Sequence, residues 1–303
     1  MNSNKTLYLV MVKGKYGYID NNGEVIIDTK FDYAEEFDED LAIVGMEGKL
    51  GFINKNGEMV IEPRFKAASP FSEDLAAVQI GYQWGYIDKE GKEAIPFNFI
   101  DAYSFNDGLA LVQIGGKQGY IDKEGNIVIE PKYNYAHSFS EGVAAVDVSK
   151  KYGYIDKAGK TTIVPKYFVA NDFSEGLASV ETSNGCGFIN KSGEMVIEPQ
   201  YEETDDFYDG YAAVCKDGKY GYIDKNGSIV VPIEYDDVDV ISEGLIGVQV
   251  GEKWGYIDMS SKIVIEPKFD DAYEFTNGIA MVELGGKIGY IDKAGNYVWK
   301  PQK

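Results

Sequence analysis

One tetrapeptide, Gly-aromatic-Ile-Asp/Asn, recurs nine times along this chain, and every interval between its copies is 34 residues. The copies begin at Gly17, Gly51, Gly85, Gly119, Gly153, Gly187, Gly221, Gly255 and Gly289. A fixed period of this length indicates one supersecondary unit that packs against copies of itself. We therefore interpret 1–303 as a single array. Its eight full units are 14–47, 48–81, 82–115, 116–149, 150–183, 184–217, 218–251 and 252–285, and its partial units are 1–13 and 286–303.

Each unit has the composition of β-structure. It carries two glycine turns, runs of about five β-branched or aromatic residues and a central proline, which leaves no room for a helical stripe. Three strands per unit are predicted: one like Lys15 to Asp20, one like Met59 to Pro63, which the proline is expected to end, and one like Leu75 to Val78. The segment between the last two, such as 66–73, is predicted to be a loop.

Four positions of the unit form rows of nearly constant residues. The isoleucine of the tetrapeptide never varies, which marks a buried face. One aromatic position follows Tyr18, another follows Phe31, and a third follows Phe37. The Tyr18 row is Tyr18, Phe52, Tyr86, Tyr120, Tyr154, Phe188, Tyr222, Tyr256 and Tyr290; the Phe37 row is Phe37, Phe71, Phe105, Phe139, Phe173, Phe207, Ile241 and Phe275. Because 34 residues cannot bury a core alone, we expect neighbouring units to share these rows.

The consensus G-K-[YW]-G-Y-I-D-K-x-G-x-x-V-I-x-P-x-Y, followed by F-S-E-G-L-A-x-V, resembles the WG repeat, or KWG repeat, of bacterial proteins. The Trp-Gly pair that names this family survives only in Trp84-Gly85 and Trp254-Gly255. The resemblance covers nearly the whole chain. It implies a bacterial protein from a family of variable repeat number, generally regarded as binding or scaffolding modules, and it supplies no catalytic residues.

Two all-β architectures fit such a unit. An open β-solenoid or superhelix of stacked three-stranded repeats accepts any copy number, whereas a closed propeller-like ring fixes the number and often completes one blade from both termini. A unit of 34 residues is short for a four-stranded blade of about 40 to 45 residues. We therefore expect the open array, with the closed ring, its termini completing one unit, as the alternative.

The charge balance excludes several partners. Lys and Arg number 29 against 50 Asp and Glu, which gives a net charge of −21. Nucleic acids and anionic membranes would be repelled. The longest apolar run near the start, Leu7 to Val12, is too short for the core of an export signal, and no stretch is long enough to span a bilayer. We expect a cytoplasmic protein with no membrane insertion, in which Cys186 and Cys215 are reduced thiols.

Catalytic and metal-binding constellations are not evident. His137 is the only histidine and is interpreted as a loop residue, and no nucleophile elbow or phosphate loop occurs. The acidic clusters are Glu35, Glu36, Asp38, Glu39 and Asp40; Glu202, Glu203, Asp205 and Asp206; Asp236, Asp237 and Asp239; and Asp270 and Asp271. They lack a calcium-loop spacing and are interpreted as a solvated rim. We expect no enzyme, no cofactor and no metal.

The first strand offers one variable position that often carries a ring. Its aromatic members are Tyr16, Trp84, Tyr152, Tyr220 and Trp254, and we call these five residues the variable ring positions. Flat rings spaced along a repeat surface suit peptide segments or sugar rings, and the competing interpretation is packing against the adjacent unit. The predicted function is a non-enzymatic scaffold for protein–protein interaction. The alternative is an array that binds carbohydrate or the cell envelope.

Overall fold

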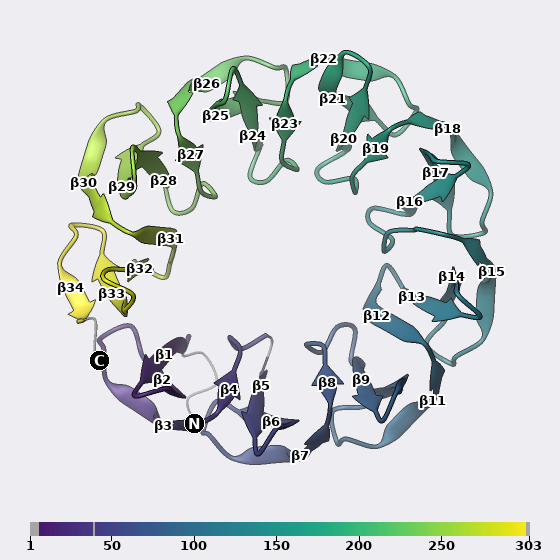
Figure 1. Cartoon of the computed structure of the whole chain (residues 1–303), viewed down its shortest axis with the longest axis horizontal. Coiled ribbons are helices and arrows are strands. Elements are labelled where there is room, and N and C mark those ends of the chain that lie inside the picture. The colour runs from purple at the N-terminus through teal and green to yellow at the C-terminus, as the bar shows by residue number, and fades with distance from the viewer. Residues whose placement is uncertain (1–5, 39, 301–303) are drawn as a thin grey trace. The chain divides into compact units, whose positions relative to one another are not determined.

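A computed structural model describes residues 6–38 and 40–300, and within these ranges all regular structure is β. The chain divides into two compact units. The first comprises Met1–Asp20 and Glu24–Tyr167, and the second comprises Asn21–Gly23 and Phe168–Lys303. No helix in the described ranges has the length and apolar character needed to cross a membrane. Each unit is a succession of small antiparallel sheets, drawn in Figure 1.

The first compact unit holds five sheets. They are β1 (Tyr8–Val12), β2 (Lys15–Ile19) and β3 (Val25–Phe31); β4 (Tyr33–Ala34), β5 (Leu41–Met46), β6 (Lys49–Asn54) and β7 (Met59–Phe65); β8 (Ala67–Ala68), β9 (Ala76–Ile80), β10 (Gln83–Ile87) and β11 (Glu93–Phe99); β12 (Asp101–Asn106), β13 (Leu109–Ile114), β14 (Lys117–Ile121) and β15 (Ile127–Tyr133); and β16 (Val143–Val148), β17 (Lys151–Asp156) and β18 (Thr161–Tyr167).

The second compact unit holds four sheets, each of four strands. They are β19 (Val169–Ala170), β20 (Leu177–Thr182), β21 (Gly185–Asn190) and β22 (Met195–Tyr201); β23 (Glu203–Thr204), β24 (Tyr211–Lys216), β25 (Lys219–Asp224) and β26 (Ile229–Tyr235); β27 (Asp237–Val238), β28 (Leu245–Val250), β29 (Lys253–Asp258) and β30 (Ile263–Phe269); and β31 (Asp271–Thr276), β32 (Ile279–Glu283), β33 (Ile288–Asp292) and β34 (Tyr297–Trp299).

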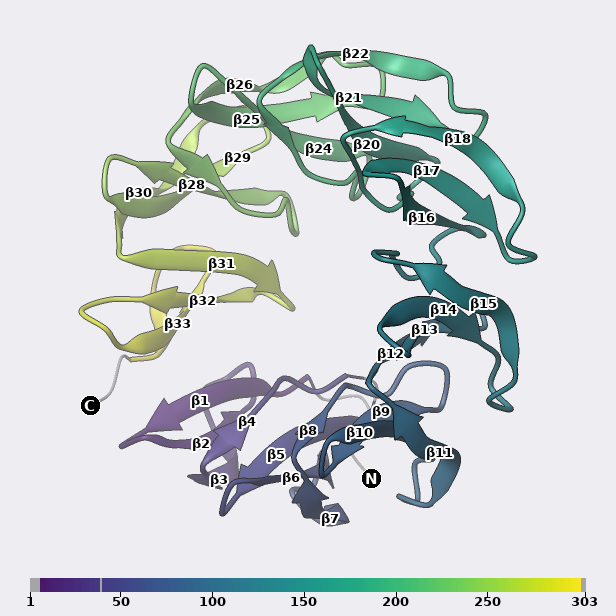
Figure 2. The ribbon, with the colours of Figure 1, turned by 45° about the vertical axis from the view of Figure 1, so that its right-hand side comes forward.

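These sheets are β-propeller blades, so the expected open solenoid of three-stranded repeats is wrong. Strands pair in chain order within a sheet, and the side-by-side strands can be followed in Figure 2. At most links within a compact unit one residue separates the last strand of a blade from the first strand of the next, as Lys66 separates β7 from β8; residues 134–142 separate β15 from β16. This link carries the chain from one edge of a sheet to the opposite edge of its neighbour, so successive sheets pack face to face. The all-β tandem architecture is confirmed, in the propeller form given as the alternative.

The short first strand is the element that the sequence analysis missed. β8 lies in the segment 66–73 that was predicted to be a loop, and only its residues Ala67 and Ala68 pair with β9. Two paired residues are too few to show a period of alternation. The alternative also expected both termini to complete one unit, and this is wrong for the described residues. β1 pairs with β2, and all strands of the last blade come from Asp271–Trp299.

The glycine of the tetrapeptide is required by a bulge between the third and fourth strands. Leu50 pairs with Phe65 and Phe52 pairs with Ile61, so the fourth strand has extra residues opposite Gly51. A Cβ on Gly51 would lie 2.4 Å from the carbonyl oxygen of Ile61. Pro63 sits in this bulge, where no ladder amide is needed, and the strand continues past it to Phe65. The expectation that the proline ends the strand is therefore wrong.

The core lies between blades. Within a compact unit, the isoleucine and the Tyr18-row ring of one strand are buried against opposite neighbours. Ile53 lies in the core shared with the preceding blade and Phe52 in the core shared with the following blade, and they are 0% and 1% exposed. Rings of the Tyr18 row meet rings of the Phe37 row in the next blade at centroid distances of 4.7 to 5.0 Å. The pairs are Tyr18 with Phe37, Phe52 with Phe71, Tyr86 with Phe105, Tyr120 with Phe139, Phe188 with Phe207, and Tyr256 with Phe275. The expectation that the rows join adjacent units is confirmed.

The tyrosine hydroxyls of this row make a second contact between blades. The Tyr18 hydroxyl donates to the carbonyl oxygen of Glu35 at 2.6 Å, and that of Tyr86 donates to the carbonyl oxygen of Tyr103 at 2.8 Å. Each acceptor lies just after or within the first strand of the next blade. The hydrogen bond satisfies a polar group that burial would otherwise make costly. The tyrosines thus fix both the spacing and the register of adjacent blades.

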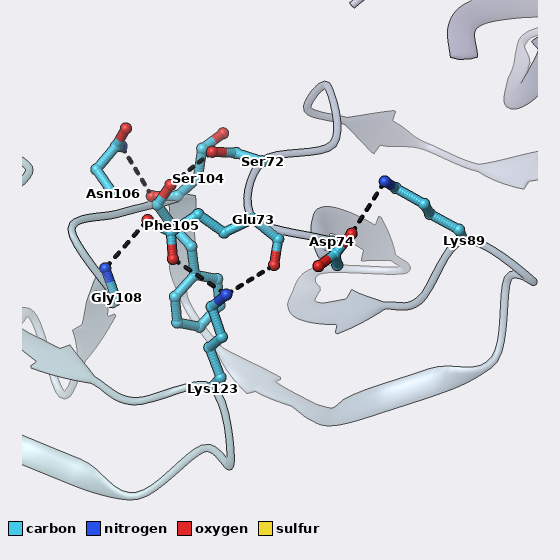
Figure 3. Close-up of polar contacts among 9 residues, drawn as sticks. All are labelled: Ser72, Glu73, Asp74, Lys89, Ser104, Phe105, Asn106, Gly108 and Lys123. Carbon is cyan, nitrogen blue, oxygen red and sulfur yellow. Dashed lines mark hydrogen bonds and ion pairs between the residues drawn. The ribbon is translucent and has the colours of Figure 1, made fainter. Parts of the chain in front are cut away.

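A polar latch closes the same junction at the Ser-Glu turn (Figure 3). The Ser72 hydroxyl donates to the carbonyl oxygen of Phe105 at 2.6 Å, and the Gly108 amide donates to Glu73 Oε1 at 3.1 Å. The Lys123 ammonium forms an ion pair with Glu73 at 3.2 Å. The same contacts recur for Ser174 and Glu175 with Phe207, Gly210 and Lys225, and for Ser242 and Glu243 with Phe275, Gly278 and Lys293.

Replacing the bulge glycine should destabilise the fold. Gly51→Ala places a methyl group against backbone that cannot move aside, and we expect a loss of about 3 kcal/mol in unfolding free energy, the scale of an overpacked core. Urea unfolding followed by circular dichroism measures it. Gly48→Asn is the matched control, because Gly48 has open space around it and a positive φ that asparagine tolerates. Equal losses in the two variants would contradict the role of the bulge.

The latch should make stability depend on pH. The bond from Lys225, with further help from the amides of Gly210 and Asp209, lowers the pKa of Glu175 from 4.5. A lowered folded pKa means that the stabilisation is present above about pH 4.5 and fades as the pH falls further. Glu175→Gln should therefore cost roughly 0.5 kcal/mol at pH 7, as a mostly exposed ion pair does, and less at pH 3. Urea titrations at both pH values test it, with exposed Glu90→Gln correcting for the change in net charge.

Candidate functional site

The five variable ring positions lie in the strands that carry the tetrapeptide, which are β2, β10, β17, β25 and β29. Each is in a different blade, so no blade holds two of them. Tyr16, Trp84, Tyr152 and Tyr220 are half-buried, and Trp254 is only 9% exposed. Trp84 packs against the core between its own blade and the next, and Trp254 belongs to such a core. For the two tryptophans, packing against the adjacent blade therefore occupies most of the ring.

The strand registers place these positions in a wider row that crosses each blade. In one blade Asp237 pairs with Gln249, and Gln249 pairs with Trp254. The corresponding trios in other blades include Tyr33, Gly45 and Leu50; Ala67, Gln79 and Trp84; Asp101, Gln113 and Gln118; and Glu203, Cys215 and Tyr220. We call this set the variable end of the blades, because its residues change from unit to unit.

One residue further along the same strands the variation almost stops. Ala34 pairs with Val44, and Val44 pairs with Gly51. The valine and the glycine of this second row are the same in every blade, and they are buried where the blades meet. The boundary between a constant core and a variable surface therefore runs between adjacent residues of a strand. At the variable end, units can therefore differ without disturbing the core.

Tyrosines and carboxylates are hydrogen-bonded in pairs at this end. The hydroxyl of Tyr103 donates to Asp101 Oδ2 at 3.1 Å, that of Tyr273 to Asp271 Oδ2 at 3.0 Å, and that of Tyr220 to Glu203 Oε2 at 2.8 Å. The hydroxyl of Tyr33 donates to Glu35 Oε1 at 2.5 Å, and this bond, with burial, raises the pKa of Tyr33 to about 12. Exposed rings beside carboxylates form a surface that favours cationic groups.

The acidic clusters are not only a solvated rim. Asp239 lies in the segment after β27, and its Oδ2 is buried with no hydrogen-bond partner. Burial, together with the charges of Glu274, Asp271 and Asp237, raises the pKa of Asp239 to about 6, against a smaller lowering by the Val240 amide. Among the described residues no group of acidic, histidine or cysteine side chains is arranged to hold a metal ion. Glu39 lies outside the described residues.

Cys186, Cys215 and His137 are the two thiols and the single imidazole of the sequence. Burial is the main cause that raises the pKa of Cys186 and of Cys215, which disfavours a reactive thiolate at either position. The ring of His137 meets the ring of Tyr152 edge-on at 6.0 Å, and its backbone carbonyl accepts the Tyr120 hydroxyl. The positions of these three groups suit packing.

The repeat unit matches a known family. The model of the WG containing repeat matches residues 16–49, 51–83, 84–117, 119–152, 152–186, 187–220, 220–254 and 254–287, so the chain belongs to the WG repeat family. A search of curated proteins finds no match.

Solved structures resemble the fold at low sequence identity. A structure described as that of the eukaryotic initiation factor is 8% identical, with a TM-score of 0.70 over 98% of this chain and 96% of that one. The dihydro-heme d1 dehydrogenase NirN in complex with DHE is 13% identical, with a TM-score of 0.53 over 87% and 72%. The WD40 β-propeller domain of Doa1 gives a TM-score of 0.37 at 12% identity, over 81% and 94%. The first two likenesses concern the fold alone.

Asp239 should make the protein less stable as the pH rises. Its folded pKa lies above the ordinary value of 3.8, so the folded state holds a proton that the unfolded state has lost between about pH 4 and 6. Asp239→Asn should therefore raise the unfolding free energy at pH 7 by about 1 to 2 kcal/mol and bring no gain at pH 4. Urea unfolding at the two pH values measures this. If the control Asp172→Asn raised the unfolding free energy at pH 7 by the same amount, the increase would come from the change in net charge and not from the burial of Asp239.

Proposed function

We propose that this chain is a non-enzymatic scaffold that binds another protein through the variable end of its blades. The observation that carries the proposal is the sharp boundary between a constant row such as Ala34, Val44 and Gly51 and a variable row one residue away. Repeated blades supply a rigid support, and propeller folds are commonly interaction scaffolds. A bacterial cytoplasmic location is part of the proposal.

The partner should carry a basic surface. The net charge is −21, and the variable end presents Asp101, Glu203, Asp237 and Asp271 beside exposed tyrosine rings. Opposite charge speeds encounter and selects against acidic partners, and lysine or arginine side chains also gain from stacking over rings. Binding of this kind weakens as salt shortens the range of electrostatic attraction.

A carbohydrate-binding array is the second candidate. It would use flat rings, and exposed rings such as Tyr33 and Tyr103 are available. The variable ring positions support it less, because Trp254 is buried and Trp84 is largely occupied by packing. The two candidates differ in the side chains they need, since sugar stacking needs the rings and a basic protein needs the carboxylates.

The test begins with cross-linking in the native cell, followed by purification of the captured protein and titration calorimetry. The double variant Asp101→Asn, Asp271→Asn should weaken binding at least tenfold at low salt, because two carboxylates of the variable end lose their charge. Exposed Glu62→Gln with Glu266→Gln on fourth strands is the matched control and should change binding less than twofold.

Two outcomes would contradict the scaffold proposal. If both double variants weaken binding equally, the variable end has no special part. If no protein is captured while a glycan array shows saturable binding that Tyr33→Ala and Tyr103→Ala abolish, the carbohydrate candidate is correct.

A further inference from the structure

The blade of β23–β26 and its junction with the next blade depart from the repeat at three positions together. Tyr208 occupies a position where Ser72, Ser140, Ser174 and Ser242 stand in other units. Tyr211 replaces a residue that is leucine, valine or isoleucine in every other unit, and Ile241 replaces the phenylalanine of the Phe37 row. Two aromatic rings are thus gained and one is lost at a single junction.

The exchange opens a cavity. In other junctions a ring of the Phe37 row covers the tyrosine of the third strand at about 5 Å, as Phe275 covers Tyr256 at 4.9 Å. Ile241 is smaller than phenylalanine, and a cavity of about 50 Å³ is lined by Asp205, Asp206, Tyr208, Tyr211, Tyr222 and Ile241, with small neighbours. Among the lining residues Tyr222 and Ile241 are buried, whereas Tyr208 is 65% exposed. We call this cavity the Tyr208 pocket.

The groups around the Tyr208 pocket favour a positive charge. Its lining residues include two aspartates and three tyrosines, and none is lysine or arginine. Desolvation, and then the nearby charges of Asp237 and Glu203, raise the pKa of Asp205. The Tyr222 hydroxyl donates to the carbonyl oxygen of Asp239 at 2.5 Å, so this ring contributes its apolar surface to the pocket. Rings and carboxylates that surround one opening attract a cation by two independent forces.

The size of the cavity limits the ligand. A buried water needs about 10 to 15 Å³ of such space, so 50 Å³ holds roughly four atoms of that size. This is the end of an alkylammonium chain, and a sugar ring or an indole would not fit. A lysine side chain has this shape, with an apolar stem that can pass between rings and a compact charged end.

We propose that the Tyr208 pocket binds the terminal ammonium group of a lysine side chain presented by the protein partner. The proposal rests on the scaffold function for the source of the lysine, but the ammonium chemistry stands on the pocket alone. The ammonium group lies between the rings of Tyr208 and Tyr211 and faces the carboxylate of Asp205. This pocket would give one blade junction a specific anchor within an otherwise broadly acidic surface.

The first experiment uses a small probe on the full chain. n-Butylammonium chloride is titrated into protein labelled at tyrosine, and ring chemical shifts are followed by NMR, with n-butanol as the neutral probe. We expect saturable shifts with the ammonium ion and at least fivefold weaker binding of the alcohol. Equal binding of the two probes, or no saturable shift, would overturn the proposal.

Variants locate the binding. Ile241→Phe restores the ring present in every other unit, so it should fold while filling the cavity, and it should abolish the saturable shifts. Asp205→Asn keeps the cavity and should weaken ammonium binding at least fivefold. Asp172→Asn, one unit earlier at the position equivalent to Asp206, should bind as the unaltered chain does. Circular dichroism confirms the fold of each variant. Undiminished binding by Ile241→Phe would overturn the proposal.

The second experiment separates this proposal from the scaffold function. Binding of the purified partner is compared for the unaltered chain and Ile241→Phe, and we expect at least a tenfold loss in the variant. Replacing the contacting lysine of the partner by norleucine or by arginine should give a similar loss. If the partner binds Ile241→Phe unchanged, the scaffold function stands and the lysine proposal is wrong. If butylammonium binds but no protein partner binds, both the proposal of a partner lysine and the proposed scaffold function are wrong.

Discussion

The structure depends on one contact that is repeated at the junctions between blades, the meeting of a Tyr18-row ring with a Phe37-row ring about 5 Å away. A single blade has two apolar faces and cannot hide either of them. Each ring pair covers one face of one blade with one face of the next, and the tyrosine hydroxyl then ties the ring to a backbone carbonyl. Stability is therefore collective, and the residues at these junctions are nearly identical from unit to unit.

The same constraint leaves the ends of the blades free to vary. Val44 and Gly51 must keep their identity because a neighbouring blade and a bulge surround them, whereas Gly45 and Leu50, one position away, do not. Carboxylates gather at this end in part of the chain, and burial together with their charges raises the pKa of Asp239.

The Tyr208 pocket follows from relaxing the ring contact at one junction. Where Ile241 takes the place of phenylalanine, Tyr222 loses its partner ring, and the space is enclosed by Tyr208 and Tyr211 instead. The serine of the polar latch is lost at the same junction, since Tyr208 stands at its position. One junction thus exchanges contacts that hold the fold for a cavity with acidic and aromatic walls, while its neighbours keep the ring pair.

The amino-acid sequence alone determined the period of 34 residues, the β character of each unit, strands such as Lys15–Ile19 and the rows of rings that join the units, because turns and alternation are local. It also named Ile241 as the exception in its row. Only the tertiary structure decided that the sheets are propeller blades, seven of the nine described sheets having four strands, that Pro63 lies within a strand, and that Trp254 is buried. The physical reason is that alternation tells which residues share a face of a strand but not what covers that face. Within each compact unit the cover is a neighbouring blade, held there by contacts between successive repeats such as that of Tyr18 with Phe37.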